Sequence, residues 1–331
     1  MTERTTRAED GAQGRGGRGG QAPQRPTQLP GRSWWAAVKR TVREFQVDNL
    51  SDWAAALTYY SVLSIFPALL VVISLVDLAG PGTIQTLLDN LGQVVPGSVN
   101  QILATAIDNL QQTRGSAGLL ALVSLATALW LASRYVAAFM RASNAIYDVP
   151  EGRPVWKTLP IRIGVTVVVM VLLAVSAVAV VATGGLAARI GRLLGIGSTA
   201  VRVWDIAKWP VLLLIVGFLF ALLYWASPNA RQPFRWITPG GILAVVVWVL
   251  ASVAFALYVA NFNSYNKTYG SLASVIIFLV WLWLSNTAIL LGAELNAELE
   301  RGRAIAAGHP PEEEPYMELR DTSKLRERDN L

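Results

Sequence analysis

Cysteine is absent from this sequence of 331 residues, and histidine occurs once, at His309. Without cysteine the chain has no disulfide framework, no thiolate nucleophile and no cysteine-ligated metal site. A single histidine cannot form the histidine cluster of a zinc site. The sequence also lacks the GxxxxGK[ST] loop that cradles phosphates, which argues against direct coupling to ATP. We therefore expect no metal and no cofactor.

Charged residues are scarce as well. They make up 15% of the chain, whereas hydrophobic residues make up 53%; a soluble domain usually carries about 25% charged residues. The charges gather in residues 1–52 and 294–331, and the sequence between these segments is mostly apolar. The mean hydropathy is +0.42. This distribution is typical of an integral membrane protein.

The first segment, residues 1–32, lacks the apolar stretch of a signal peptide and is rich in Arg, Gly, Gln and Pro. It has too little apolar surface to offset the entropy of ordering, so we expect a disordered cytoplasmic tail. The run from Arg15 to Gly20 is open to two interpretations. It resembles an RNA-binding RGG segment, but a solvated basic tail near anionic lipids is the interpretation we favour, with no nucleic-acid partner.

Residues 33–50 have the pattern of an amphipathic helix. Apolar and basic side chains fall on different faces, the apolar face carrying Trp34, Val38, Val42 and Phe45, and the basic face Lys39, Arg40 and Arg43. Such a helix can lie in the membrane interface, with tryptophan at the level of the head groups. Alternatively, it packs as a soluble helix on the cytoplasmic loops.

Apolar segments of membrane-spanning length then recur along the chain. At about 1.5 Å per residue each can cross a hydrocarbon core about 30 Å thick, the fourth only marginally. We predict an all-α polytopic bundle of about six transmembrane helices, with short amphipathic interfacial helices within residues 80–115. Pro67 is expected to kink the first span. The predicted spans are residues 53–79, 116–140, 163–188, 209–226, 237–260 and 272–292.

The distribution of Lys and Arg between the connections predicts the orientation. With both termini in the cytoplasm, the inner connections carry Arg141, Arg153, Lys157, Arg162, Arg231 and Arg235. The connection between the third and fourth spans opposes this orientation, since it places Arg189, Arg192, Arg202 and Lys208 outside. The balance predicts a multi-pass protein of the bacterial inner membrane with both termini in the cytoplasm.

Three motifs occur in a fixed order: AALTYYSVLSIFP at residues 55–67, YGS at residues 269–271 and LGAELN at residues 291–296. With these motifs the sequence resembles the YihY/BrkB family of bacterial inner-membrane proteins over residues 35–300. The resemblance implies a six-span membrane domain, here residues 33–300, followed by a polar cytoplasmic tail at 301–331. It also implies a poorly defined activity, because members have been labelled ribonuclease BN, linked to serum resistance or proposed as transporters.

The ribonuclease label fits this sequence badly. A hydrolytic nuclease needs clustered carboxylates for metal ions or a histidine acid–base pair. Here the only histidine lies in the C-terminal tail, and the predicted spans hold almost no carboxylates. We therefore do not expect an enzyme.

Ionisable residues within a membrane are costly and mark candidate functional sites. Arg134 in the second span is the strongest candidate. The predicted orientation places it at a depth similar to that of polar residues in the first and sixth spans, namely Tyr59, Tyr60, Ser64, Glu294 and Asn296. We hypothesise a polar vestibule open to the cytoplasm, in which Arg134 either pairs with Glu294 or coordinates an anionic head group. Alternatively, Arg134 extends to the interface as a membrane anchor and Glu294 only marks the membrane boundary.

The connection between the fifth and sixth spans is polar and aromatic. Its asparagines favour tight turns, and glycine permits backbone conformations that other residues avoid. The segment is either a plain hairpin or an outer gate that contacts a substrate. The candidate gate residues are Asn261, Asn263, Tyr269 and Gly270.

Three functions from different classes remain open. The first is transport of a lipid or a small polar or anionic solute. The second is a non-transporting envelope scaffold or integrity factor, and a membrane-associated ribonuclease is a third, weaker alternative. The expected partners are the bilayer, anionic lipids bound through the basic tail and loops, and the transported molecule; the sequence does not predict an oligomeric state.

Overall fold

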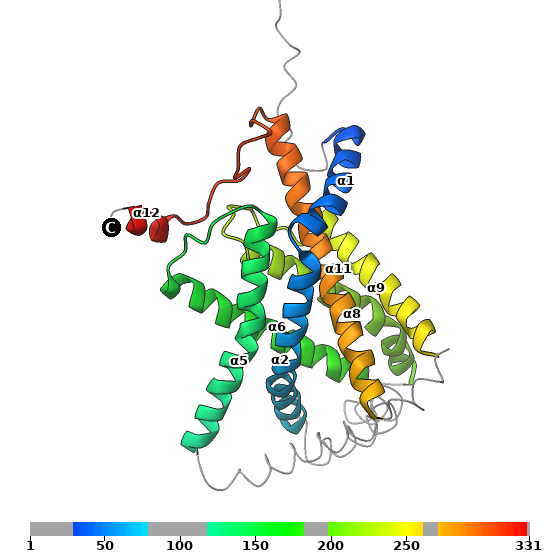
Figure 1. The fold of residues 1–331 in the computed structure, drawn as a ribbon. Coiled ribbons are helices and arrows are strands. Elements are labelled where there is room, and N and C mark those ends of the chain that lie inside the picture. Colours follow the sequence, from blue (N-terminus) through cyan, green and yellow to red (C-terminus); the bar gives the residue numbers. More distant parts are fainter. Residues whose placement is uncertain (1–28, 79–117, 182–197, 261–270, 330–331) are drawn as a thin grey trace, which may run out of the picture.

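The computed structural model describes residues 29–78, 118–181, 198–260 and 271–329. This part of the chain is all-helical and contains no strand beyond one isolated bridge between Ala230 and Leu319. Figure 1 shows the helices. They are α1 (Gly31–Val47), α2 (Leu50–Leu78), α5 (Gly118–Ile146), α6 (Val155–Val181), α8 (Ser198–Ala226), α9 (Pro239–Ala260), α11 (Ser271–Ala306) and α12 (Ser323–Asp329).

Four of these helices are long and apolar enough to cross a membrane, over Val155–Ser176, Ile206–Ala226, Pro239–Val259 and Val275–Ala306. The expected class, a polytopic α-helical membrane protein, is therefore confirmed. The predicted total of about six spans also requires α2 and α5, which have 29 residues each.

The fourth and sixth predicted spans differ most from the structure. α8 begins at Ser198 instead of residue 209, so it is not marginal in length. The helix continues through Lys208, whose side chain is buried within the fold. α11 continues to Ala306, well past the predicted end at residue 292. Its last turns therefore extend beyond the predicted span and pack against other parts of the protein.

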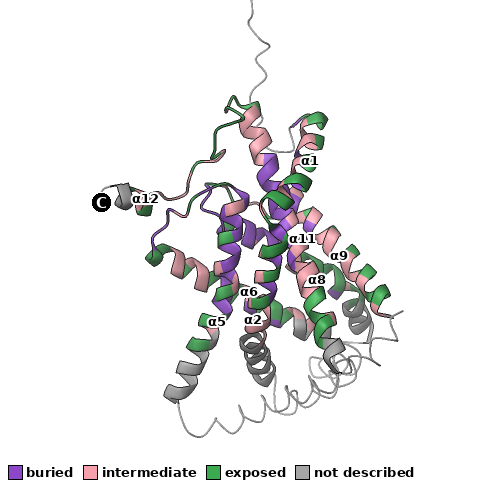
Figure 2. Ribbon diagram, viewed as in Figure 1, coloured by how far each residue is buried: buried purple, intermediate pink, exposed green. Residues whose placement is uncertain are grey.

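The helices converge at one end of the bundle, which we call the terminal face because α1, the end of α11 and α12 all lie there (Figure 1). The buried residues concentrate in this half of the molecule (Figure 2). Phe139 of α5 is fully buried, and its ring stacks between Tyr135 and Tyr224 with centroid separations of 6.5 and 6.4 Å. The core thus joins α5 to α8.

Away from the core the helices expose apolar side chains. On α9, Leu250, Val253 and Leu257 are 64, 55 and 61% exposed. A continuous apolar surface of this kind is unusual for a soluble monomer and is expected where a helix contacts lipid. The exposed surface therefore agrees with the spans assigned by length and hydropathy.

α9 and α11 approach each other through small residues. A Cβ atom added at Gly292 would lie 2.4 Å from the carbonyl oxygen of Gly240 and 2.7 Å from the Cβ atom of Ala244. Small residues permit such close contact, which stabilises helix association in lipid, where burial from water provides no driving force. Gly240 and Gly292 are thus required by the packing of these two helices.

α1 combines the two interpretations of the amphipathic helix. Ala37 and Thr41 are buried, and Arg40 forms an ion pair with Glu298, so one face packs on α11. Trp35 and Val42 are 63 and 67% exposed on the remaining surface. The helix is therefore docked on the bundle and still presents apolar side chains outward.

The segment after α11, predicted as a polar tail, folds back along the terminal face. The backbone N–H of Arg320 donates to the carbonyl oxygen of Asn229 at 2.7 Å, and that of Arg231 donates to Glu318 at 2.8 Å. Asn229 is fully buried, and its side-chain amide donates to the carbonyl oxygens of Pro150 and Asp321. The C-terminal segment thus holds together the connections that follow α5 and α8.

We predict that Gly292→Ala destabilises the protein by about 1–3 kcal/mol, because the added methyl group overpacks the contact between α9 and α11. Thermal unfolding in detergent measures the effect. Gly217→Ala in α8 is the matched control, because a Cβ atom there meets nothing within 4 Å. Equal melting temperatures for the two variants would contradict the proposed role of this contact.

Candidate functional site

A chain of polar side chains crosses the bundle between α5, α11 and α2. The Tyr135 hydroxyl donates to Oδ1 of Asn286 at 2.9 Å, and Nδ2 of Asn286 donates to the Thr58 hydroxyl at 3.2 Å. Thr58 in turn donates to the carbonyl oxygen of Ala54 at 2.8 Å. Asn286 is only 3% exposed. Its amide is thus satisfied on both sides, as a buried polar group requires.

Thr58 also borders an open groove between α2 and α11, which we call the membrane groove. Its volume is about 450 Å³, within the range of small-molecule sites. Tyr59 is 61% exposed at its edge, and the Trp283 indole N–H is 3.3 Å from the carbonyl oxygen of Ser51. The groove is lined by Ala55, Thr58, Tyr59, Val62, Leu279, Val280 and Trp283.

The groove and the polar chain together have the chemistry of an amphipathic-ligand site. Its walls are mostly aliphatic and aromatic, and Tyr59 is the exposed residue with a hydroxyl group at its edge. The Thr58 hydroxyl is bonded to the Ala54 carbonyl oxygen and to Asn286. A few polar groups in an apolar pocket fix the orientation of a ligand. This arrangement suits a lipid or another amphipathic molecule better than a freely hydrated ion.

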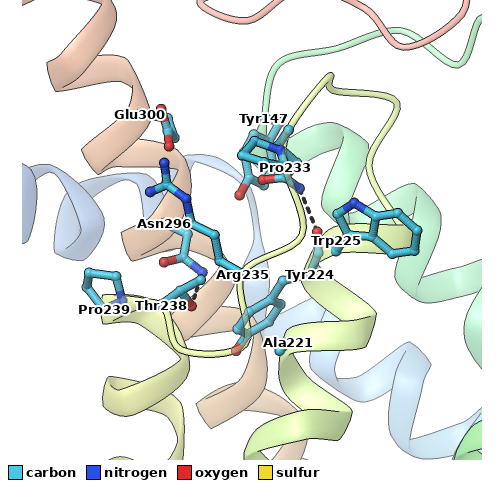
Figure 3. A pocket seen from close by; sticks show the side chains of 11 residues that line it. Tyr147, Ala221, Tyr224, Trp225, Pro233, Arg235, Thr238, Pro239, Asn296 and Glu300 are labelled. Atoms are coloured by element: carbon cyan, nitrogen blue, oxygen red, sulfur yellow. Dashed lines mark hydrogen bonds between the residues drawn. The ribbon is translucent and has the colours of Figure 1, made fainter. Parts of the chain in front are cut away.

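A second, smaller pocket lies at the terminal face (Figure 3). Its volume is about 40 Å³, enough for a few water molecules. Asn296 lines it, and its amide is satisfied: Oδ1 accepts from the Gly240 N–H at 2.9 Å and Nδ2 donates to the Thr238 hydroxyl at 3.1 Å. Asn296 therefore fixes the start of α9 on α11.

Glu294 occupies a third environment, inside the contact between α11 and the connection from α1 to α2. It is 1% exposed, and its Oε2 has no hydrogen-bond partner. Its carboxyl interacts with that of Asp48. One turn further along α11, Glu298 pairs with Arg40 and lies 3.4 Å from Arg301. The arginines of this region thus balance only part of the negative charge of its carboxylates.

The environment of Asp48 changes its titration. Burial raises the pKa of Asp48 to about 6, and the negative charge of Glu44 adds to this increase. Asp148, which follows α5, is also affected: burial raises its pKa to about 7, with further contributions from Glu314 and Asp48. Both groups lie in connections between helices at the terminal face, Asp48 half-buried and Asp148 exposed at the surface. This face therefore changes its charge within the physiological pH range.

Arg134 does not form the pair predicted with Glu294. It is exposed on α5, its guanidinium lies 5.9 Å from the centre of the Trp130 ring, and no ion pair joins it to Glu294. Similar depth in the membrane led to the prediction, but depth does not determine the direction of a side chain. Arg134 points outward from the bundle, whereas Glu294 is enclosed by it.

The other predicted residues are also distributed over separate places. The Tyr60 ring packs edge-on against Tyr59 at 5.3 Å, and the Ser64 hydroxyl donates to the Tyr60 carbonyl oxygen at 2.7 Å. α2 continues as a helix through Pro67, and a kink there stays a prediction. The structure does not bring the proposed vestibule residues into one cavity, and their part in binding stays a prediction.

The proposed outer gate lies outside the described residues. Asn261, Asn263, Tyr269 and Gly270 all fall between the end of α9 and the start of α11. Their role therefore stays a prediction.

Sequence reasoning missed Asn286, Tyr135 and Arg162. Asn286 is an amide in the middle of an apolar span, and this alone marks it as a buried polar group that needs partners. Tyr135 directly follows Arg134 but gives no signal, since tyrosine is common in spans. Arg162 was counted only as a charge in a connection, because the third span was predicted to begin at residue 163. In the structure it lies within α6.

No group of three or more His, Asp or Glu side chains that could hold a metal ion occurs among the described residues.

The fold defines a class: a multi-pass α-helical membrane protein, here with a largely apolar groove between α2 and α11. The family described as virulence factor BrkB matches residues 41–316. The chain therefore belongs to the BrkB family, as its three motifs had indicated.

Named relatives agree with this family. The ribonuclease-like protein YfkH of Bacillus subtilis is 30% identical over 80% of this chain and 93% of its own length. UPF0761 membrane proteins of Aromatoleum aromaticum and Chromohalobacter salexigens are 34 and 31% identical over 77 and 85% of this chain. The chain spans 62% of the Aromatoleum protein, so that relative is considerably longer. No solved structure matches this chain.

We predict that Asn286→Leu destabilises the protein by about 1–2 kcal/mol, because the Tyr135 hydroxyl loses its acceptor within the bundle. Thermal unfolding in detergent gives the measurement. Thr287→Val is the matched control on the next position, since Thr287 bonds only to the Trp283 carbonyl oxygen of its own helix. A smaller loss for Asn286→Leu than for Thr287→Val would show that the polar chain contributes little.

A second prediction concerns pH. Because the folded pKa of Asp48, about 6, exceeds the unfolded value of about 3.9, the folded state binds more protons between these values. The contribution of Asp48 to stability therefore falls as pH rises from about 4 to about 6. Asp48→Asn should raise the melting temperature relative to wild type, and more at pH 7.5 than at pH 4.5. Glu312→Gln removes an exposed carboxylate and should show no such pH-dependent gain in melting temperature. An equal effect of Asp48→Asn at both pH values would contradict the raised pKa of Asp48.

Proposed function

We propose that this protein is a transporter of the bacterial inner membrane that moves a lipid or a small amphipathic, anionic molecule across the bilayer. The membrane groove is the observation that carries the proposal. It lies between two helices of the bundle, is open at its side, and has an almost entirely apolar surface with Tyr59 exposed at its edge. A molecule with an apolar chain and a polar head can enter such a groove directly from the membrane.

The proposal includes six membrane crossings, with α2 and α5 as the first two, and both termini in the cytoplasm. The basic side chains of the terminal face support this orientation. Arg153, Lys157 and Arg231 all lie there and form ion pairs with Glu151, Asp321 and Glu318. A reporter that is active only outside the cytoplasm, fused at either terminus, should therefore be inactive.

Tyr59 and Thr58 are the residues proposed to contact the head of the transported molecule. Hydrogen bonds connect Thr58 on α2 through Asn286 on α11 to Tyr135 on α5. A change at the Thr58 hydrogen bond can therefore alter the contact between α11 and α5. Such a chain suits a protein in which occupation of the groove changes the packing of α2 on α11. Energy for directed movement would come from a gradient or a partner.

A non-transporting envelope scaffold is the second candidate. It is favoured by the closed packing of the terminal face, where Asn229 and Asn296 are buried and bonded. The ribonuclease-like name of the Bacillus relative belongs to that protein. We propose no catalytic role here.

Filling the groove tests the proposal. In liposomes containing fluorescent phospholipids, Ala55→Trp should slow lipid movement between leaflets by about tenfold or more, equivalent to a barrier raised by about 1.4 kcal/mol. Leu250→Trp adds the same ring to the exposed surface of α9 and should keep the wild-type rate. Wild-type protein that moves neither lipids nor anionic solutes faster than empty liposomes would reject transport in favour of the scaffold.

A further inference from the structure

Three arginines gather on α5 and α6 without acidic partners. The Arg162 guanidinium lies 4.3 Å from the centre of the Trp130 ring, and that of Arg134 lies 5.9 Å from the same ring. Arg134 and Arg141 are both close enough to interact electrostatically with Arg162. No carboxylate among the described residues forms an ion pair with any of the three.

Arg162 is the residue that needs a partner most. Its Nε and Nη2 atoms are buried and make no hydrogen bond. The indole ring offers an attractive surface to a cation but accepts none of the in-plane N–H groups of a guanidinium. A half-buried guanidinium with two unsatisfied donors and two like charges nearby is unfavourable unless an anion is bound.

The positions along α5 show where such an anion would bind. Trp130, Arg134 and Arg141 are spaced by four and seven residues and so fall on one face of the helix. All three are exposed, as is Leu131 beside them, at 40%. The arginines therefore lie on the outer surface of a bundle whose surroundings are lipid. Arg141 lies about two turns nearer to the terminal face than Arg134.

We propose that Trp130, Arg134 and Arg162 form a binding site for the phosphate of an anionic phospholipid on the outer surface of α5 and α6. Arginine presents paired N–H donors that match the oxygens of a phosphate. The exposed Trp130 and Leu131 side chains border the site, where the glycerol and upper acyl chain of the lipid would lie. Arg141 adds positive charge towards the head-group region.

This site is separate from the membrane groove between α2 and α11. It does not depend on transport, because a scaffold can bind an anionic lipid equally well. If the groove variants did not alter flux, the proposed lipid site would therefore still stand. If the arginine variants did not alter lipid retention, the proposed role of the groove would still stand.

The test compares lipid binding by full-length protein in nanodiscs. The protein is reconstituted in nanodiscs of phosphatidylcholine that contain a minor fraction of phosphatidylglycerol. Native mass spectrometry then counts the phosphatidylglycerol molecules that stay bound to the protein. Wild type should retain phosphatidylglycerol preferentially, and Arg134→Gln with Arg162→Gln should reduce the retained amount at least fivefold. The matched control, Arg231→Gln with Arg326→Gln, removes the same charge from exposed positions of the terminal face and should retain the wild-type amount.

Two further arms make the result decisive. Arg162→Lys keeps the positive charge but loses the paired N–H donors, so it should retain an intermediate amount of phosphatidylglycerol. This variant also provides the test if the double glutamine variant fails to fold. Inorganic phosphate added to nanodiscs of phosphatidylcholine alone should not raise the melting temperature of the wild type. The proposal would be overturned if wild type and both Arg162 variants retained equal amounts of phosphatidylglycerol. It would also be overturned if free phosphate raised the melting temperature as much as phosphatidylglycerol does.

Discussion

Polar side chains on α11 have to find partners away from water, and the arrangement of the bundle depends on this constraint. Asn286 binds α5 and α2, while Asn296 holds the start of α9. Glu298 binds α1 through Arg40. Because these side chains are buried and need partners within the protein, each of them fixes a neighbouring helix at a particular height. α11 is thus the helix around which the others are placed, and the close contact at Gly292 sets its distance from α9.

Much of the fold could be predicted from the sequence because length and hydropathy determine which segments enter a membrane. The spans matching α6, α9 and α11 and the amphipathic helix α1 were identified in this way. The ends were harder to predict, because a helix continues beyond the membrane wherever protein packs against it. α11 shows this best: its last turns carry Glu298 and Arg301, whose partners lie on α1 and on the C-terminal segment.

The candidate site was less predictable, and Arg134 and Glu294 explain why. The sequence gives their depth, but their rotation about the helix axis depends on which face of each helix is enclosed. Arg134 turns outward to Trp130, whereas Glu294 turns inward to Asp48. Hydrogen bonds between distant residues, such as Tyr135 with Asn286, cannot be read from one sequence at all. The motif AALTYYSVLSIFP, by contrast, did contain the Thr58 and Tyr59 side chains of the membrane groove.

The fold-back of the C-terminal segment has a consequence for biosynthesis. Asn229, in the connection between α8 and α9, is buried between Asn144, Pro150 and Asp321. Two of these partners are synthesised before it, but Asp321 follows it by 92 residues. The helices can therefore insert one after another, while the final closure of this end waits until Asp321 has left the ribosome. A nascent protein that is already anchored in the bilayer would still be accessible to proteases and chaperones at this one surface.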